Sequence, residues 1–166
     1  MQVHSDSDLS GLLESLVANE VPQGRGLEAW TALLRAHATL VRQLETDLKT
    51  ETDLALADFD VLAQLAVAGG KLRMTELADR ALISRSGMTR RVANLVDQGL
   101  VARAGANADA RGVVVSLTDA GVARLTETAP VHARGVARLF VAQLDDDELA
   151  ALKGALDKVT LDCTFG

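Results

Sequence analysis

The segment 84–91, SRSGMTRR, concentrates side chains that donate hydrogen bonds. On a helix, Met88, Val92 and Leu95 would share one apolar face. The outward side of its N-terminal half then presents Ser86, Thr89 and Arg90, with Arg85 and Arg91 at the edges. Arginine pairs with guanine edges through two parallel hydrogen bonds, and threonine offers a hydroxyl and a methyl group. Because the N-terminal residues of a recognition helix enter the major groove, this pattern predicts contact with duplex DNA.

The charge of the chain is unevenly distributed along the sequence. Residues 71–111 hold eight basic and four acidic side chains, which give +4, while the whole chain has a net charge of −6, so the remainder carries −10. A basic module in an acidic protein is the electrostatic pattern of a surface that binds a polyanion. On charge alone, a solvated helix face that binds nothing is an equal alternative. A stacking surface for single-stranded nucleic acid is not expected, because the chain has only three Phe, one Trp and no Tyr.

The two runs LVARA and VVVSL that follow this segment predict a hairpin of two strands with a long tip, GANADARG. Arg111 in the tip is expected to reach the adjacent minor groove or the phosphates. Asp109 lies two residues earlier and is expected to fix the tip by pairing with Arg111. Arg103, on the first strand, has two open interpretations, a phosphate contact and an internal ion pair.

The elements that would position these residues are mostly helices. Apolar residues spaced three and four apart predict a long helix over 27–48 and another over 122–139, which Pro130 is expected to kink. Gly69 and Gly70 would end a helix that begins near residue 56. Thr75 and Ser84 are predicted N-caps of two shorter helices, which with their turn form a helix-turn-helix unit. A last helix is expected to start in the acidic run 145–147.

Together, the stretches SRSGMTRRVANLVDQGLVAR, DAR and VVVSLTDAG resemble the winged-helix signature of the MarR family of transcriptional regulators. The resemblance covers about residues 27–159 and implies a mainly α fold with a small β-hairpin wing. It divides one compact domain into N-terminal dimerisation helices (1–53), a winged helix-turn-helix DNA-binding region (54–117) and C-terminal dimerisation helices (118–166). The family's wing usually has a second basic residue between its Asp and its Arg, and this chain has Ala110 there.

The resemblance also implies a homodimer that represses a nearby gene from a pseudo-palindromic operator and is released by a small aromatic or anionic ligand. Trp30 and His37, two turns apart on the first long helix, are candidates to line the ligand pocket, with Asp60 and Arg103 as further polar contacts. For Trp30 and His37 the alternative is packing in the core or the dimer seam. For Asp60 and Arg103 the alternative is an internal salt bridge.

Other classes of protein fit the sequence less well. An enzyme is not expected, because the chain has no Ser/His/Asp order, no phosphate-cradling glycine loop and no pair of carboxylates at a strand end. Three scattered His and one Cys lack metal-ligand spacing, so neither a metal nor a cofactor is expected. The absence of a signal peptide and of a long apolar run predicts a cytoplasmic protein without a membrane partner. Two alternatives stay open, a helical ligand-binding or interaction bundle that does not bind DNA, and a small enzyme that uses His37 or His132.

Overall fold

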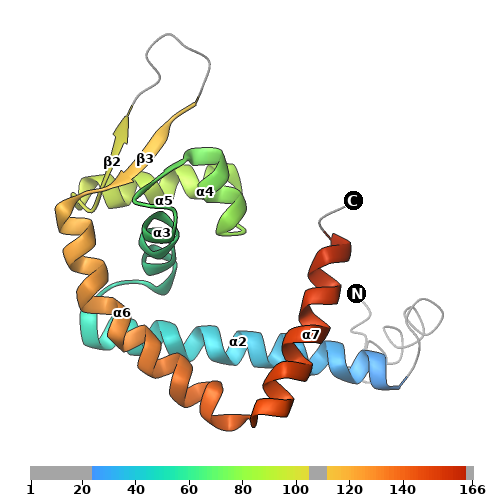
Figure 1. Ribbon diagram of the computed structural model, residues 1–166. Helices are drawn as coiled ribbons and strands as arrows, with labels where there is room; N and C mark the ends of the chain where they lie inside the picture. Colours follow the sequence, from blue (N-terminus) through green and yellow to red (C-terminus); the bar gives the residue numbers. More distant parts are fainter. Residues whose placement is uncertain (1–23, 105–111, 164–166) are drawn as a thin grey trace, which may run out of the picture. The chain divides into compact units, whose positions relative to one another are not determined.

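The computed structural model describes residues 24–104 and 112–163, which belong to two compact units, Met1–Val41 and Arg42–Gly166 (Figure 1). The predicted helix before Pro22 and the wing tip with Asp109 and Arg111 lie outside the described residues. The elements in chain order are α2 (Arg25–Thr52), α3 (Leu56–Val67), β1 (Lys71–Arg73), α4 (Met74–Arg80), α5 (Arg85–Asp97), β2 (Val101–Ala104), β3 (Val114–Leu117), α6 (Asp119–Leu139), the 3₁₀ turn η1 (Val141–Gln143) and α7 (Asp146–Cys163).

The first unit, where it is described, consists of the N-terminal part of α2. Helix α2 as a whole, Arg25–Thr52, confirms the long helix predicted over 27–48. Its apolar residues are open to solvent in the single chain, with Trp30 55% exposed and Leu34 49% exposed. A row of exposed apolar side chains on one helix is typical of a surface that another element covers.

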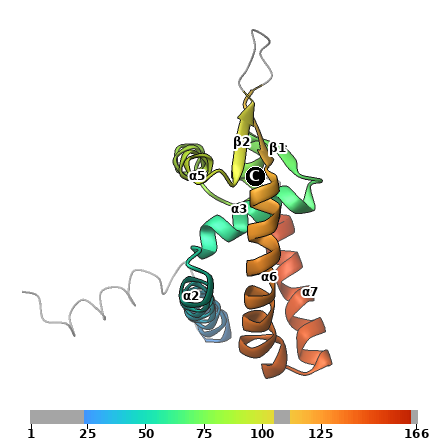
Figure 2. The same ribbon diagram turned by 90° about the vertical axis from the view of Figure 1, so that its left-hand side faces the viewer.

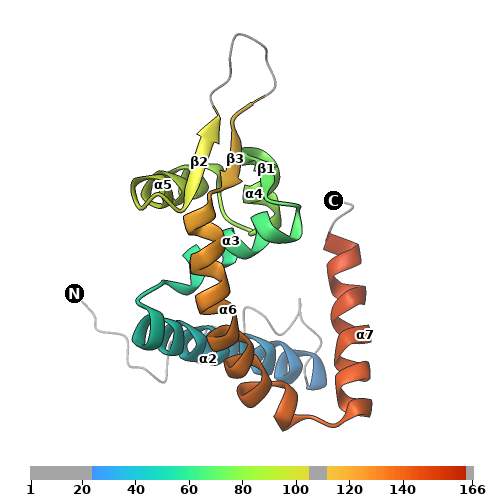
Figure 3. The ribbon, with the colours of Figure 1, turned by 60° about the vertical axis from the view of Figure 1, so that its left-hand side comes forward.

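The second unit has a core of aliphatic side chains from α3, α4, α5 and the sheet. Its fully buried members include Leu62, Leu65, Leu77, Met88, Leu95 and Val115. Met88, Val92 and Leu95 all have 0% exposure, which confirms the predicted inner face of α5. The long α6 crosses α3 and continues away from the sheet, as Figure 3 shows. None of the described helices is long and apolar enough to cross a membrane.

The wing belongs to a three-stranded antiparallel sheet with the order β1-β3-β2. The predicted pair is present, with Val101 opposite Leu117 and Ala104 opposite Val114. The sequence did not reveal β1, in which Leu72 pairs with Val115. This strand has three residues, too few for a period of two to stand out, and it gains its hydrogen bonds only from the distant β3.

Side-chain caps start most of the helices of the second unit. The Ser84 hydroxyl accepts from the backbone N–H of Gly87 at 3.2 Å, as predicted for α5. The Asp145 carboxylate accepts from the N–H of Glu148 at 2.8 Å at the start of α7, which confirms the helix start in the acidic run. The prediction of Thr75 as a cap was wrong, because β1 runs straight into α4 and the extended Arg73 occupies the N-cap position.

Helix α6 is continuous through Pro130 and packs on the C-terminal part of α2. Two ion pairs of 2.7 Å join these helices, Arg138 with Asp47 and Arg134 with Glu51. The pairs are spaced by four residues on both helices, so they lie on facing sides. Gly135, next to Arg134 on α6, allows a close approach, because a Cβ atom there would lie 2.6 Å from Cδ2 of Leu44 on α2.

The first turn of α6 rests on the backbone that follows α5. The hydroxyl of Thr118 donates to the carbonyl of Gly99 at 2.7 Å and accepts from the N–H of Gly121 at 3.0 Å. The N–H of Thr118 also donates to the Leu100 carbonyl at 3.2 Å. Thr118 therefore caps α6 and joins it to the backbone that follows α5.

Candidate nucleic-acid interface

Helix α5 lies beside β2, and Figure 2 looks nearly along its axis. The helix-turn-helix unit consists of α4, the turn Ala81–Ser84 and α5. Burial of Met88, Val92 and Leu95 in the core fixes which face of α5 looks outward. Arg85, Ser86, Thr89 and Arg90 are all exposed, on the side that the sequence predicted.

The outward side chains of α5 have free hydrogen-bonding capacity. The hydroxyl of Thr89 donates to the carbonyl of Arg85 at 2.9 Å, which leaves its oxygen available as an acceptor. The hydroxyl of Ser86 lies 3.4 Å from that of Ser84. Within the described part of the chain, Arg85 and Arg90 form no ion pair. Their guanidinium groups are therefore available for an external acceptor.

Arg91 differs from these neighbours. It is half-buried, and its Nη1 lies 2.7 Å from Oδ1 of Asp58 in the first turn of α3. The side chain of Arg91 is 31% exposed and that of Asp58 is 17% exposed. The predicted contact of Arg91 with DNA stays a prediction, but the guanidinium already has a carboxylate partner. No sequence pattern indicated Asp58 as the partner, because an acidic residue in the first turn of a helix is ordinary.

The predicted wing residues are only partly placed by the structure. Arg103 is exposed on β2, and it has no ion pair among the described residues. Its predicted role as a phosphate contact or an internal pair therefore stays open. Asp109 and Arg111, the predicted wing salt bridge, lie outside the described residues.

The four predicted ligand contacts belong to different units. Trp30 and His37 are exposed on the part of α2 in the first unit, whereas Asp60 on α3 and Arg103 on β2 belong to the second. The predicted pocket would draw on both units, and it stays a prediction. The alternative of a salt bridge between Asp60 and Arg103 is also not found, since neither has an ion pair in the described part of the chain.

A small polar cluster that the sequence did not reveal lies where α3 meets α6. The ring of His132 packs on Phe59 with 4.5 Å between centroids, and its buried Nδ1 has no hydrogen-bond partner among the described residues. Desolvation raises the pKa of Asp60 above 3.8, although the charges of His132 and Arg91 oppose this shift. Asp60 as a whole residue is exposed, so its carboxyl is only partly shielded.

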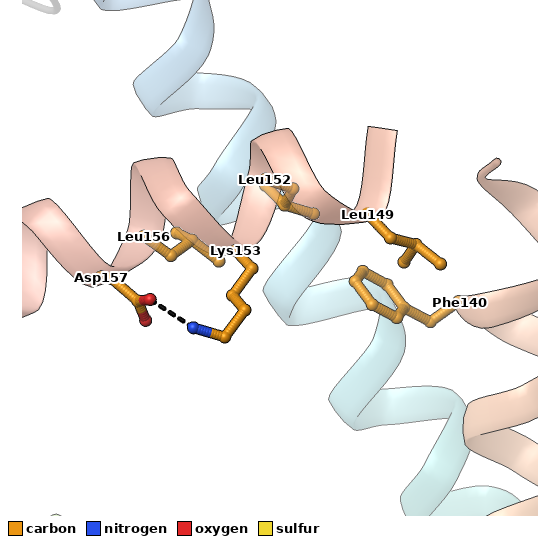
Figure 4. A pocket seen from close by; sticks show the side chains of 6 residues that line it. All are labelled: Phe140, Leu149, Leu152, Lys153, Leu156 and Asp157. Carbon is orange, nitrogen blue, oxygen red and sulfur yellow. Dashed lines mark hydrogen bonds and ion pairs between the residues drawn. The ribbon is translucent and has the colours of Figure 1, made fainter. Parts of the chain in front are cut away.

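A hollow on α7 is apolar and unrelated to these residues. Figure 4 shows it lined by Phe140, Leu149, Leu152 and Leu156, with the ion pair of Lys153 and Asp157 at its rim. Its volume is about 330 Å³. Leu149, Leu152 and Leu156 are the apolar stripe of the last helix. The described residues also contain no group of three His, Cys, Asp or Glu side chains that could hold a metal ion.

Comparisons with known proteins agree with this geometry. A family model described as MarR family matches residues 52–112, a range that includes α3, β1, the helix-turn-helix unit and β2 and ends before β3. A comparison with curated protein sequences found no match.

Solved structures extend the similarity beyond the matched region. Sco3205, a MarR family transcriptional regulator from Streptomyces coelicolor solved with DNA, is 29% identical with a TM-score of 0.77, over 85% of this chain and 91% of that one. A variant of MarR from E. coli, solved with operator DNA, is 28% identical with a TM-score of 0.70, over 87% and 97% of the two chains. BpsR from Bordetella bronchiseptica, whose DNA binding is regulated by 6-hydroxynicotinic acid, has the same fold, with 24% identity and a TM-score of 0.69 over 80% and 98%.

Proposed function

We propose that this chain is a transcriptional regulator of the MarR family that binds double-stranded DNA through α5. The observation that carries the proposal is the division of α5 into two faces. Met88, Val92 and Leu95 are fully buried, while Arg85, Ser86, Thr89 and Arg90 are exposed on the other side. A helix anchored in this way presents its polar N-terminal half to a groove without loss of core packing.

The DNA site is a pseudo-palindrome bound by a homodimer that acts in the cytoplasm. Exposed apolar residues on α2 and α7, such as Trp30, Leu34 and Leu156, support a partner chain over these helices. Residues 1–53 and 118–166 would then supply the dimerisation helices, and 54–117 the DNA-binding region. A two-fold dimer presents two copies of α5 to one face of the duplex, so half-sites about one helical turn apart are expected.

Regulation is by repression, with release by a small aromatic or anionic ligand. BpsR, which shares the fold, responds to an aromatic acid. Trp30 would provide a flat apolar wall, and His37 a hydrogen bond or a counter-charge. Asp60 and Arg103 are the further polar candidates. The ligand must bind more tightly to a form whose two recognition helices no longer match the operator, because equal affinity for both forms shifts nothing.

The test of DNA binding uses a duplex selected from a random pool by the wild-type protein. Arg90→Ala should cost about 1–3 kcal/mol per half-site if Arg90 reads a guanine, and should lose sequence preference. Arg111→Ala should weaken binding to every sequence and lower the salt slope by about 1 per wing. Arg42→Ala is the matched control, since Arg42 is an exposed arginine on α2 without an ion pair in the described residues. Equal binding by wild type and Arg90→Ala would refute the assignment of α5.

The test of ligand release uses phenolic and other aromatic acids, screened by thermal shift and by operator release. A compound that releases the operator should lose affinity for Trp30→Ala and His37→Ala while both variants still bind DNA. Wild-type responses in these variants would refute this pocket. If no compound releases the duplex, the protein is a constitutive regulator or is switched by a partner. If the wild type selects no duplex, the helical interaction bundle is the better interpretation.

A further inference from the structure

We propose that Arg91 positions the recognition helix by holding it against α3 through Asp58, an inference that rests on the proposed DNA-binding function. The atoms Nη1 and Oδ1 of the two side chains are 2.7 Å apart. Asp58 and Arg91 are 33 residues apart in sequence and lie on different helices. Their bond therefore fixes α5 relative to a helix that belongs to the core.

The surroundings of Arg91 suit this role better than a contact with DNA. Arg85 and Arg90 are exposed and have no ion pair among the described residues, whereas Arg91 is half-buried and its Nε is buried. A carboxylate at 2.7 Å offsets most of the attraction that the guanidinium would exert on a phosphate. To reach a groove, Arg91 would have to break this bond and expose its packed stem.

The core alone leaves the orientation of α5 loosely specified. Met88, Val92 and Leu95 bury the inner face, but apolar burial has no direction and tolerates small rotations of a helix. A charge-assisted hydrogen bond has both a distance and an angle to satisfy. Asp58 is a firm anchor for it, because the N-terminal end of α3 stabilises a negative charge in its first turn.

The direction in which Asp58→Asn changes DNA affinity distinguishes a positioning role of the ion pair from a purely electrostatic one. Asp58→Asn removes a negative charge near the proposed DNA surface, so electrostatics alone would strengthen binding to the selected duplex. If Asp58 holds Arg91, the variant should instead bind the duplex about tenfold more weakly. This loss lies within the range of interaction energies measured for residues in contact. Arg91→Gln should cause a similar loss, and the double variant should bind no more weakly than either single variant. The salt slope should stay unchanged in all three, whereas loss of a phosphate contact would lower it by about 1.

Asp47→Asn is the matched control. Asp47 forms an ion pair of the same 2.7 Å length with Arg138, and its side chain is 19% exposed against 17% for Asp58, but it lies on α2. This variant should keep wild-type affinity for the duplex. Amide hydrogen exchange without DNA gives an independent readout, because Asp58→Asn should speed exchange along α5 and Asp47→Asn should not.

Three results would overturn the inference. These are wild-type or tighter DNA binding by Asp58→Asn, a salt slope lowered only in Arg91→Gln, and additive losses in the double variant. If the wild type binds no duplex at all, the proposed function fails, and the exchange of α5 amides in Asp58→Asn still decides whether the ion pair holds the helix.

Discussion

Replacement of Gly121 by alanine should strongly destabilise the protein. A Cβ atom at this position would lie 2.0 Å from the carbonyl oxygen of Leu100 and 3.2 Å from Cδ2 of Leu117. The carbonyl oxygen belongs to the backbone, so relief requires the start of α6 to move by about 1 Å, at a cost of about 1–3 kcal/mol for overpacking. The same movement strains the Thr118 cap, worth about 0.5–2 kcal/mol, while alanine returns up to about 1 kcal/mol of helix propensity. The free energy of unfolding should fall by about 2–4 kcal/mol.

Urea denaturation followed by circular dichroism measures this change, and thermal unfolding should show a midpoint lowered by roughly 5–15 °C. Two helical glycines serve as controls. Gly154→Ala meets no atom within 4 Å and should raise stability by up to about 1 kcal/mol. Gly135→Ala would place its Cβ 2.6 Å from the end of the flexible Leu44 side chain, so its cost should lie between the other two. A Gly121→Ala variant as stable as Gly154→Ala would refute the reasoning about the Leu100 carbonyl.

Three further outcomes are expected. Leu82, in the turn between α4 and α5, has φ of +53° and is 93% exposed. Because glycine adopts this backbone conformation without strain, Leu82→Gly should raise the free energy of unfolding in urea by about 0.5–1 kcal/mol. An unchanged midpoint of the urea transition would argue against strain at this position. Burial raises the pKa of the Asp60 carboxyl, so the contribution of this group to stability is full below pH 3.8 and is lost as the pH rises through the folded-state pKa. Asp60→Asn should therefore raise the free energy of unfolding at neutral pH but not at about pH 3. A gain in stability that persists in acid would contradict this cause. Light scattering should give the mass of a dimer at micromolar concentration, and a folded monomer would contradict the proposed role of the exposed apolar residues on α2 and α7.

Local patterns in the sequence were enough to predict most of the helices and the outward face of α5. The three-four spacing of apolar residues located α2 and α6, and Ser84 marked the start of α5. These signals are local, because propensity, capping and periodicity act within a few turns. The exposed positions of Arg85 and Arg90 follow from that same periodicity.

Features that depend on distant residues were not accessible to this reasoning. Strand β1 exists because β3, more than 40 residues later, supplies its hydrogen bonds. The partner of Arg91 is on another helix, and the close approach of Gly121 to Leu100 arises from tertiary packing. No local pattern encodes which carboxylate meets which arginine once the helices pack. The predicted wing pair lies outside the described residues, and the predicted ligand contacts belong to two separate units, so both stay predictions.

Thr118 links the start of α6 to the backbone that follows α5, so a rotation of α6 about its first turn acts on that backbone through Thr118. With 21 residues, α6 extends about 30 Å from that point. A sideways displacement of about 2.5 Å at its far end, next to η1, therefore corresponds to a rotation of about 5°. Because the carbonyl of Gly99 accepts from the capping hydroxyl itself, such a rotation would also displace the backbone that follows α5. Because Val131 of α6 belongs to the same core as Met88, and His132 packs on Phe59 of α3, such a rotation would also have to be absorbed where α6 contacts α3.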